Sequence, residues 1–356
     1  MSLPSAIHLA DDIRLGARLP LYHGFRALGW PAPLPLAMSF VVTDRCNSLC
    51  ATCHIGKRYL DDPRIADGEL SLDEHRALYR SIGRPAWITL SGGEPFMRKD
   101  FPEIAAALIE TVRPRVVNVP TNATFVHATF EGTKRILRAP GSTRLVLNLS
   151  IDAIGKEHDR LRGFEGNFER MQLLYEKLRT LRDPRLVIGV NTVISSFNAG
   201  TARRTIDYVL DELRPDSFVV EVAQHRPEYH NDEVALRPDP ALVHDLLEHV
   251  RRRLGSSDRR GVARLIRAFR MHLLREADAP RPHRCFAGFA TCAILPHGEV
   301  WSSTSRADVL GNVRDFDLDF GALWRSAGAR RARAAIRHDS CTCESSNVAY
   351  TNALLS

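Results

Sequence analysis

The sequence predicts an α/β fold, a partial (β/α)6 TIM-like barrel followed by a small C-terminal part. Six short runs rich in β-branched residues recur along residues 37–225, and segments with helical periodicity or helix-capping residues lie between them. The centres of these runs are about 30–50 residues apart, which is the spacing of βα units. Six such units favour an open, partial barrel over a closed barrel of eight.

The elements follow in order along the chain. The predicted strands are Ala37–Thr43, Ala86–Leu90, Arg115–Val119, Leu145–Ile151, Leu186–Val193 and Ser217–Ala223. Ser71 and Glu74 form a capping box that opens one helix, and Pro102 stands in the first turn of the next, Asp100–Thr111. The helix Asn167–Arg182 has an apolar face made of Phe168, Met171, Leu174 and Leu178.

We expect four parts along the chain. Residues 1–36 form an N-terminal extension with a helix at Ala6–Ala17, and residues 37–225 form the barrel core. Residues 226–280 form a helical linker with the helices Asp239–Leu254 and Arg259–Glu276, and residues 281–356 form a C-terminal module.

The composition is that of a soluble globular protein. Of the 356 residues, 44% are hydrophobic and 26% are charged, which excludes disorder over most of the chain. The longest mostly apolar stretch near the start, Leu34–Val42, is about half the ~20 residues of a membrane span. Any apolar segment of a signal peptide is interrupted by Asp11, Asp12, Arg14 and Arg18. We therefore expect a cytoplasmic protein without membrane contact.

The seven cysteines fall into two groups. The first is Cys46, Cys50 and Cys53, and the second is Cys285, Cys292, Cys341 and Cys343. An odd count without a signal peptide argues against a disulfide framework and for metal binding or reactivity in a reducing compartment. Because a four-iron cluster takes four ligands, a group of three leaves one iron open, whereas a group of four is closed.

Polar residues follow the predicted strands at the points where these end. The first cysteine group follows strand one, and Ser91–Pro95 follows strand two. Later strand ends carry Pro120–Asn122, Ser150, Asp152 and Gln224–Arg226. In (β/α) barrels the chemistry lies at the C-terminal ends of the strands. These residues are therefore the candidates for an active site.

The first cysteine group resembles the signature of the radical S-adenosylmethionine (SAM) enzymes. Three features agree: the spacing Cys-x3-Cys-x2-Cys, its place after strand one, and Gly92-Gly93-Glu94-Pro95 after strand two. The resemblance covers about residues 37–224 and implies that the three cysteines bind a [4Fe–4S] cluster whose fourth iron binds SAM. It further implies reductive cleavage of SAM to a 5′-deoxyadenosyl radical, which abstracts a hydrogen atom from the substrate. Zinc bound by the three cysteines and His54 is the alternative.

The same resemblance implies the remaining cofactor contacts. Gly92 and Gly93 would let the backbone approach the SAM amino group without a Cβ clash, with Glu94 and Pro95 beside them. Asn122 and Ser150 are small polar groups suited to the ribose or the carboxylate. Arg162 would pair with the SAM carboxylate. The alternatives are a strand-end hydroxyl at Ser150 and a solvated loop charge at Arg162, and Asp152 is expected to cap the following loop.

The C-terminal region resembles the SPASM and twitch modules of these enzymes, which carry auxiliary iron–sulfur clusters. Ser303 stands where such modules have a cysteine. If His297 and Gly298 form a two-residue turn, Cys292 lies directly opposite Ser303 and takes its place as a ligand. One auxiliary [4Fe–4S] cluster would then be held by Cys285, Cys292, Cys341 and Cys343. In the alternatives, Ser303 or a small molecule supplies the fourth ligand, and Cys292 is a free or ordinary buried thiol.

A ligand set of three plus four uses all seven cysteines. No thiol then remains as a hydrogen-atom donor, which disfavours an epimerase and favours oxidation, with the auxiliary cluster as electron acceptor. The expected activity is that of an oxidoreductase-type enzyme that oxidises or rearranges a small molecule in specialised biosynthesis. The alternatives are a maturase of ribosomal peptides, a radical epimerase that uses a free cysteine, and a non-catalytic zinc or iron–sulfur module.

The substrate and the partners are expected from loops and charge. Gln224, His225, Arg226 and Tyr229 follow strand six and bind substrate or form a plain surface loop. Together with the net charge of +7, Arg226 suggests an anionic substrate. The basic runs Arg251–Arg253 and Arg259–Arg260 are a solvated face or the docking site of an acidic electron donor such as flavodoxin or ferredoxin. No basic run with interleaved aromatic residues marks a nucleic-acid groove.

Overall fold

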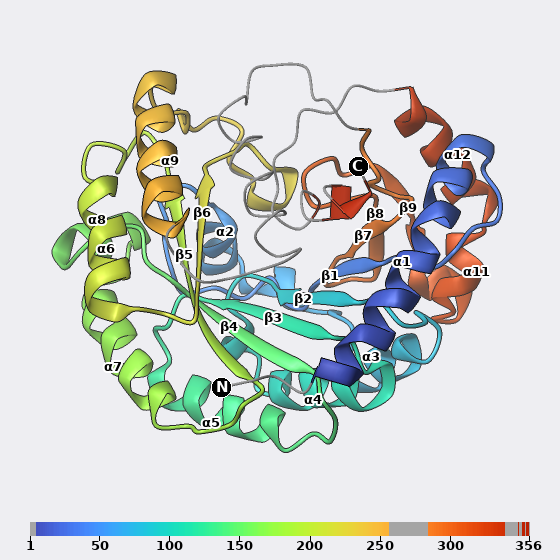
Figure 1. The fold of residues 1–356 in the computed structure, drawn as a ribbon, viewed down its shortest axis with the longest axis horizontal. Helices are drawn as coiled ribbons and strands as arrows, with labels where there is room; N and C mark the ends of the chain where they lie inside the picture. The colour runs from blue at the N-terminus through green and yellow to red at the C-terminus, as the bar shows by residue number, and fades with distance from the viewer. Residues whose placement is uncertain (1–4, 256–283, 339–347, 349–350, 353, 356) are drawn as a thin grey trace.

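A computed structural model describes residues 5–255, 284–338, 348, 351–352 and 354–355 (Figure 1). Its strands form one sheet in the order β6-β5-β4-β3-β2-β1-β7-β8-β9. The predicted helix Arg259–Glu276, together with Cys341 and Cys343, lies outside the described residues. No helix in the described part of the chain combines the length and the apolar character that a membrane crossing needs.

All six predicted strands are confirmed, and they run parallel in sequence order. They are β1 Ala37–Val41, β2 Trp87–Ser91, β3 Val116–Thr121, β4 Arg144–Ser150, β5 Leu186–Ile194 and β6 Ser217–Val222. Each strand turns alternate residues to opposite faces. One face is apolar and buried in the core, as Leu145, Leu147 and Leu149 show on β4. The other face, here called the inner face, carries Val146, Asn148 and Ser150.

Helices cover the apolar face of the strands (Figure 1). They are α2 Ile55–Asp61, α3 Leu72–Tyr79, α4 Phe101–Val112, α5 Val126–Leu137, α6 Lys156–Arg162, α7 Asn167–Arg179 and α8 Ala202–Tyr208, which continues into a π-helical turn, Val209–Leu213. The predicted capping box is confirmed in both halves: Glu74 N donates to Ser71 Oγ at 3.2 Å, and Ser71 N donates to Glu74 Oε2 at 2.8 Å. After β6 comes α9, Pro240–Gly255.

The C-terminal strands extend the sheet of the barrel core instead of forming a separate one. Strand β7, Thr291–Ile294, pairs in parallel with β1. It is followed by the antiparallel strands β8, Glu299–Trp301, and β9, Val309–Asn312. Two helices follow, α11 Phe320–Trp324 and α12 Ala327–Arg337.

The predicted register of the β7–β8 hairpin is wrong by one residue. Ala293 pairs with Trp301 and Ile294 with Val300, which places Ser302 rather than Ser303 opposite Cys292. The turn has three residues instead of two, because Gly298 N donates to Leu295 O at 2.9 Å and Gly298 adopts a φ of +89°. Since side chains alternate along a strand, a slip of one residue moves Ser303 to the opposite face from Cys292.

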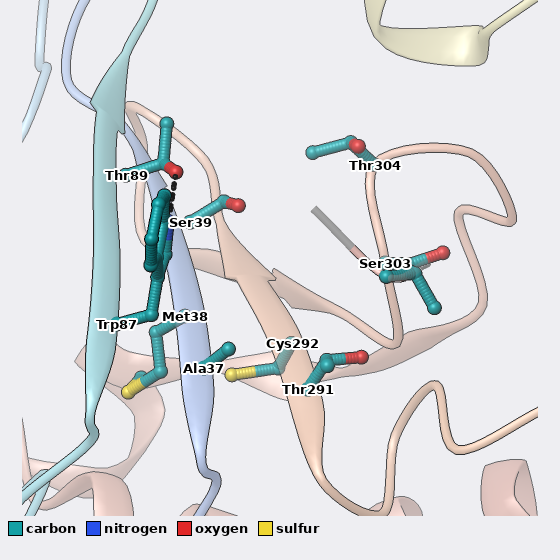
Figure 2. A pocket seen from close by; sticks show the side chains of 10 residues that line it. Ala37, Met38, Ser39, Trp87, Thr89, Thr291, Cys292, Ser303 and Thr304 are labelled. Carbon is teal, nitrogen blue, oxygen red and sulfur yellow. Dashed lines mark hydrogen bonds between the residues drawn. The ribbon is translucent and has the colours of Figure 1, made fainter. Parts of the chain in front are cut away.

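Cys292 lies on the apolar face of β7. It pairs with Met38 of β1, and both side chains belong to the hydrophobic core. Burial raises the pKa of Cys292 far above its usual range, although the Arg333 guanidinium nearby opposes that shift. Figure 2 shows its sulfur directed toward β1 and away from Ser303. This is the surrounding of a buried thiol, one of the alternatives that the sequence leaves open.

The N-terminal helix α1, Ser5–Leu28, packs on the C-terminal elements. It is longer than the predicted segment and contains Pro20. The Phe25 ring lies 5.3 Å from the ring of Phe289, centroid to centroid, and Arg26 Nε donates to Cys285 O at 2.8 Å. The residues expected as an extension thus stabilise the segment that leads into β7.

Candidate active site

The loop that carries the first cysteine group spans residues 42–54, directly after β1. Backbone hydrogen bonds join its beginning to the loop after β2. Gly93 N donates to Thr43 O at 2.8 Å, and Glu94 N donates to Arg45 O at 2.7 Å. The cysteine loop is therefore fixed at the C-terminal edge of the sheet by the chain itself.

Cys46, Cys50 and Cys53 are free thiols, and each interacts electrostatically with another of the three. Burial raises the pKa of Cys46 to about 12 and also raises the pKa of Cys50 and Cys53. Without a cation nearby these thiols would stay protonated at neutral pH, whereas a coordinated metal deprotonates its thiol ligand outright. Three soft sulfur donors on one loop, none of them in a disulfide, fit an iron–sulfur cluster.

A single metal ion would need a tighter arrangement. Among the described residues, no three His, Cys, Asp or Glu side chains converge on one point that would hold an ion. A four-iron cluster does not require such convergence, because each cysteine binds a different iron. His54, the proposed fourth zinc ligand, instead places its backbone N within 2.8 Å of Tyr229 O.

The two motif glycines leave room for the cysteine loop. A Cβ on Gly92 would lie 2.6 Å from Thr43 O. A Cβ on Gly93 would lie 2.2 Å from Arg45 O and 2.7 Å from the Cβ of Cys46. Only glycine allows the two loops to pass this closely. The structure thus gives these glycines a role within the chain, and their contact with SAM stays a prediction.

Gly93→Ala is expected to displace the cysteine loop. Its new methyl group would have to push the backbone at Arg45 away, and overpacking of this kind costs about 1–3 kcal/mol. We expect iron content after anaerobic reconstitution to fall below half of the parent's value. Gly24→Ala is the control, since a Cβ at Gly24 meets nothing within 4 Å. Equal iron content in the two variants would contradict the packing argument.

Glu94 and Asn122 connect the loops after β1, β2 and β3. The buried Glu94 carboxylate accepts from Thr121 Oγ1 at 2.9 Å and from Asn122 N at 2.6 Å. Burial raises the pKa of Glu94 to about 7, although these hydrogen bonds oppose the shift. Asn122 Nδ2 donates to Asn47 Oδ1 at 2.9 Å and to Ser48 Oγ at 2.8 Å, both on the cysteine loop. Both residues therefore support that loop, and their contact with SAM stays a prediction.

Arg162 forms a buried ion pair beside the cysteines. Its Nη2 lies 2.8 Å from Asp152 Oδ2, with the two side chains 13% and 11% exposed. Its Nη1 lies 3.9 Å from Cys50 Sγ, and its Nε has no hydrogen-bond partner within the described chain. A solvated loop charge, the alternative for Arg162, is thereby wrong. A buried guanidinium with an unused donor fits an anionic group at this place, such as the SAM carboxylate.

Asp152 does more than cap a loop. Its Oδ1 accepts from Val193 N at 2.8 Å, while its Oδ2 pairs with Arg162. Ser150 ends β4 as expected, half-buried, and its hydroxyl makes no hydrogen bond to the residues described here. Pro95 begins a short 3-10 turn, Pro95–Met97, whose first N–H group at Phe96 donates to the Glu94 carboxylate.

The loop after β6 packs against the cysteine loop. Tyr229 O accepts from His54 N, and Asn231 Nδ2 donates to Thr52 O, each at 2.8 Å. Asn231 also binds its own loop, through Gln224 O at 3.1 Å and through His225 Nδ1, which lies 3.0 Å from Asn231 O. Residues 224–231 therefore belong to the site, and the plain surface loop is wrong for all but the exposed His225 side chain.

The charge of Arg226 is balanced inside this loop. Its Nη1 donates to Tyr229 OH at 3.1 Å. Carboxylate oxygens of Glu221 and Glu228 lie 3.9 Å and 3.6 Å from the guanidinium. Burial raises the pKa of Glu228 to about 7, although Arg226 opposes the shift. The residue on which an anionic substrate was expected is thus already paired with two acidic residues, neither of which the sequence singled out.

The first basic run also carries its own partners. Arg251 pairs with Glu248 at 2.5 Å, and Arg253 pairs with Asp207 and Asp211 at 2.5 Å and 2.6 Å. Arg259 and Arg260 lie outside the described residues. The solvated face expected here is consistent with these pairs, and docking of an acidic electron donor stays a prediction.

Comparison with known proteins identifies the core. Residues 40–209 match the Radical SAM superfamily. The chain belongs to this superfamily. It is 27% identical over 216 residues to Fe-coproporphyrin III synthase from Methanosarcina barkeri and 36% identical over 177 residues to the AdoMet-dependent heme synthase of the same organism. These matches cover 59% and 49% of this chain, but only 50% and 46% of the two relatives, so this radical SAM protein aligns with about half of each.

Solved radical SAM structures share the fold. SuiB from Streptococcus suis, bound to SAM, superposes with a TM-score of 0.60 at 16% identity, covering 91% of this chain and 72% of its own. The enzyme anSMEcpe, with bound AdoMet and Cp18Cys peptide, gives a TM-score of 0.56 at 13% identity, covering 83% and 82%. At these identities the likeness extends to the fold alone.

Proposed function

We propose that this radical SAM enzyme oxidises a small molecule at the C-terminal edge of its barrel. The observation that carries the proposal is the loop after β1, where three partly or fully buried free thiols lie beside the unused donor of Arg162. When bound there, the cluster and SAM supply abstraction of a substrate hydrogen atom. The 5′-deoxyadenosine that this chemistry leaves behind distinguishes an enzyme from a non-catalytic iron–sulfur module.

The chain's own residues would position and shield these groups. Cys46, Cys50 and Cys53 would hold the cluster, and Arg162 would bind the SAM carboxylate. Gly93 and Asn122 hold the cysteine loop in place. The loop after β6 covers that loop from the side of His54 and thereby excludes water.

A small-molecule substrate is supported by the names of the relatives. Both Methanosarcina barkeri proteins are named for the synthesis of tetrapyrroles, which are small molecules. The peptide alternative is supported by anSMEcpe, a protein of similar fold that is known with a bound peptide. We favour the small molecule because sequence identity to the first two is higher. Electron delivery by an acidic protein remains part of the proposal.

An auxiliary cluster at the C-terminal module would accept the electron from the substrate radical. Its proposed ligands are Cys285, Cys341, Cys343 and, as the fourth, Cys292. The core position of Cys292 makes it the ligand that most needs a test. The same position weakens the epimerase alternative, because the thiol lies on the apolar face of β7 rather than on the inner face.

Iron per chain in single variants tests these ligands. We expect about eight irons in the reconstituted parent and about four in Cys285→Ala, because losing a ligand at the auxiliary site empties one cubane. Cys292→Ala should match Cys285→Ala if all four cysteines are ligands. Parent-like iron in Cys292→Ala would make it a buried thiol, and parent-like iron in both would contradict the auxiliary cluster.

A further inference from the structure

A rising row of amide side chains crosses the inner face of the sheet. Asn118 on β3 pairs with Val146, so that Asn148 lies two residues further along β4. Asn148 in turn pairs with Gly189, so that Asn191 lies two residues further along β5. The row therefore climbs, strand by strand, toward the C-terminal edge that carries the cysteine loop.

The upper part of this row lacks donors. Asn118 Nδ2 donates to Thr89 Oγ1 at 3.4 Å, and Asn148 Nδ2 donates to Asn118 Oδ1 at 2.6 Å. Asn148 Oδ1 and Asn191 Oδ1 are buried and have no hydrogen-bond partner in the described part of the chain. A Cβ at Gly189 would lie 1.9 Å from Asn148 Oδ1, so the glycine leaves room for that oxygen. Buried acceptors are rarely left unpaired, and a ligand or a water that donates would satisfy both.

Hydroxyl groups surround a small cavity next to the row (Figure 2). It measures about 10 Å³, room for one water, one hydroxyl or one amino group. The hydroxyl-bearing residues that line it are Ser39, Thr89, Thr291, Ser303 and Thr304. Thr291 is 3% exposed, and its Oγ1 has no hydrogen-bond partner among the described residues. Thr89 connects this cavity to Asn118 and thus to the row.

The charges around the row are not suited to an anion. Asn191 pairs with Val219, so that Glu221 lies two residues further along β6 and continues the climb with a carboxylate. Glu221 and Glu228 share the single guanidinium of Arg226. An anion bound there would meet this acidic excess, and burying a charge without a partner is strongly unfavourable.

We propose that the inner face binds a neutral or positively charged substrate rich in hydroxyl or amino groups, and that Asn148 and Asn191 select it by accepting hydrogen bonds. This inference rests on the proposed function and names its substrate class. It replaces the anionic substrate expected from Arg226 and the net charge.

Charge-sorted metabolites test the substrate class. A deproteinised small-molecule extract is separated by ion exchange into anionic, neutral and cationic fractions, and each is given to the reduced holoenzyme with SAM. We expect the neutral or the cationic fraction to raise 5′-deoxyadenosine formation above the level without extract. Stimulation by the anionic fraction alone, or by none, would overturn the substrate class. Product formed without any extract would show that the proposed function nevertheless stands.

Variants of the row test the residues. Asn148→Leu or Asn191→Leu should raise the amount of fraction needed for half-maximal stimulation about tenfold, since a lost hydrogen bond to a buried group costs about 1–3 kcal/mol. Asn191→Asp should shift the preference toward the cationic fraction, which a merely structural residue would not do. Val146→Ala, an apolar inner-face neighbour, is the matched control. Iron content shows that each variant is folded, and an unchanged response in all three Asn variants would refute the selection by Asn148 and Asn191.

Discussion

The combined change of Cys46, Cys50 and Cys53 to Ala will remove about four irons and four sulfides per chain after anaerobic reconstitution. The three thiols lie on one loop, interact with one another and form no disulfide, so they are available as one ligand set. Their pKa values are raised by burial, and a bound cluster is what would keep them ionised. The same variant should form no 5′-deoxyadenosine.

A matched control separates cluster loss from misfolding. Cys292→Ala also removes a buried thiol, yet it should keep the iron of the first site, whatever happens at the second. Iron in the triple variant equal to that of the parent would place the cluster elsewhere and contradict the assignment of this loop.

Asp152→Ala will destabilise the protein by about 3–5 kcal/mol, because it leaves the buried Arg162 guanidinium without its counter-charge. It also removes the acceptor of Val193 N, which helps to fix β5 at the site. We expect a lower free energy of unfolding by denaturant titration and weaker SAM binding, since Arg162 would lose its orientation beside Cys50.

The control is Asp245→Ala, which breaks an exposed ion pair with Arg203. Exposed pairs of this kind contribute about 0–1 kcal/mol, so this variant should unfold nearly like the parent. A similarly small effect of Asp152→Ala would mean that the Arg162–Asp152 pair is not the anchor we describe.

The barrel was predictable because its strands follow simple periodicity. Runs such as Leu145–Ile151 alternate apolar residues for the helix-covered face with residues of the inner face, and the structure confirms all six. The capping box at Ser71 and Glu74 was equally readable, because its two hydrogen bonds are local. Helix α1 was predicted too short, since it continues through Pro20, a residue that normally interrupts helices.

Register and pairing were beyond the sequence. Whether Pro296-His297-Gly298 forms a two- or a three-residue turn depends on the left-handed backbone at Gly298, and that choice decides which face Ser303 occupies. The pairing of β7 with β1 joins residues far apart in the chain. Likewise, the partners of Arg226 and Arg162 come from loops whose approach no local pattern reveals.

The site was predictable in its ligands and less so in its supports. The cysteine spacing marks the loop after β1 directly. The glycine motif was also found, but its closest contacts are to Thr43 and Arg45, because two loops cross there. The amide row was missed, since Asn118, Asn148 and Asn191 are separated by helices and meet only through strand register.

Formation of 5′-deoxyadenosine tests the central claim most directly. The reconstituted parent is reduced with dithionite under anaerobic conditions in the presence of SAM, and the nucleoside is quantified by chromatography and mass spectrometry. The account predicts 5′-deoxyadenosine from the parent and none from the variant that lacks Cys46, Cys50 and Cys53. A fully iron-loaded parent that leaves SAM intact would contradict it, and a passive iron–sulfur module would then be the better description.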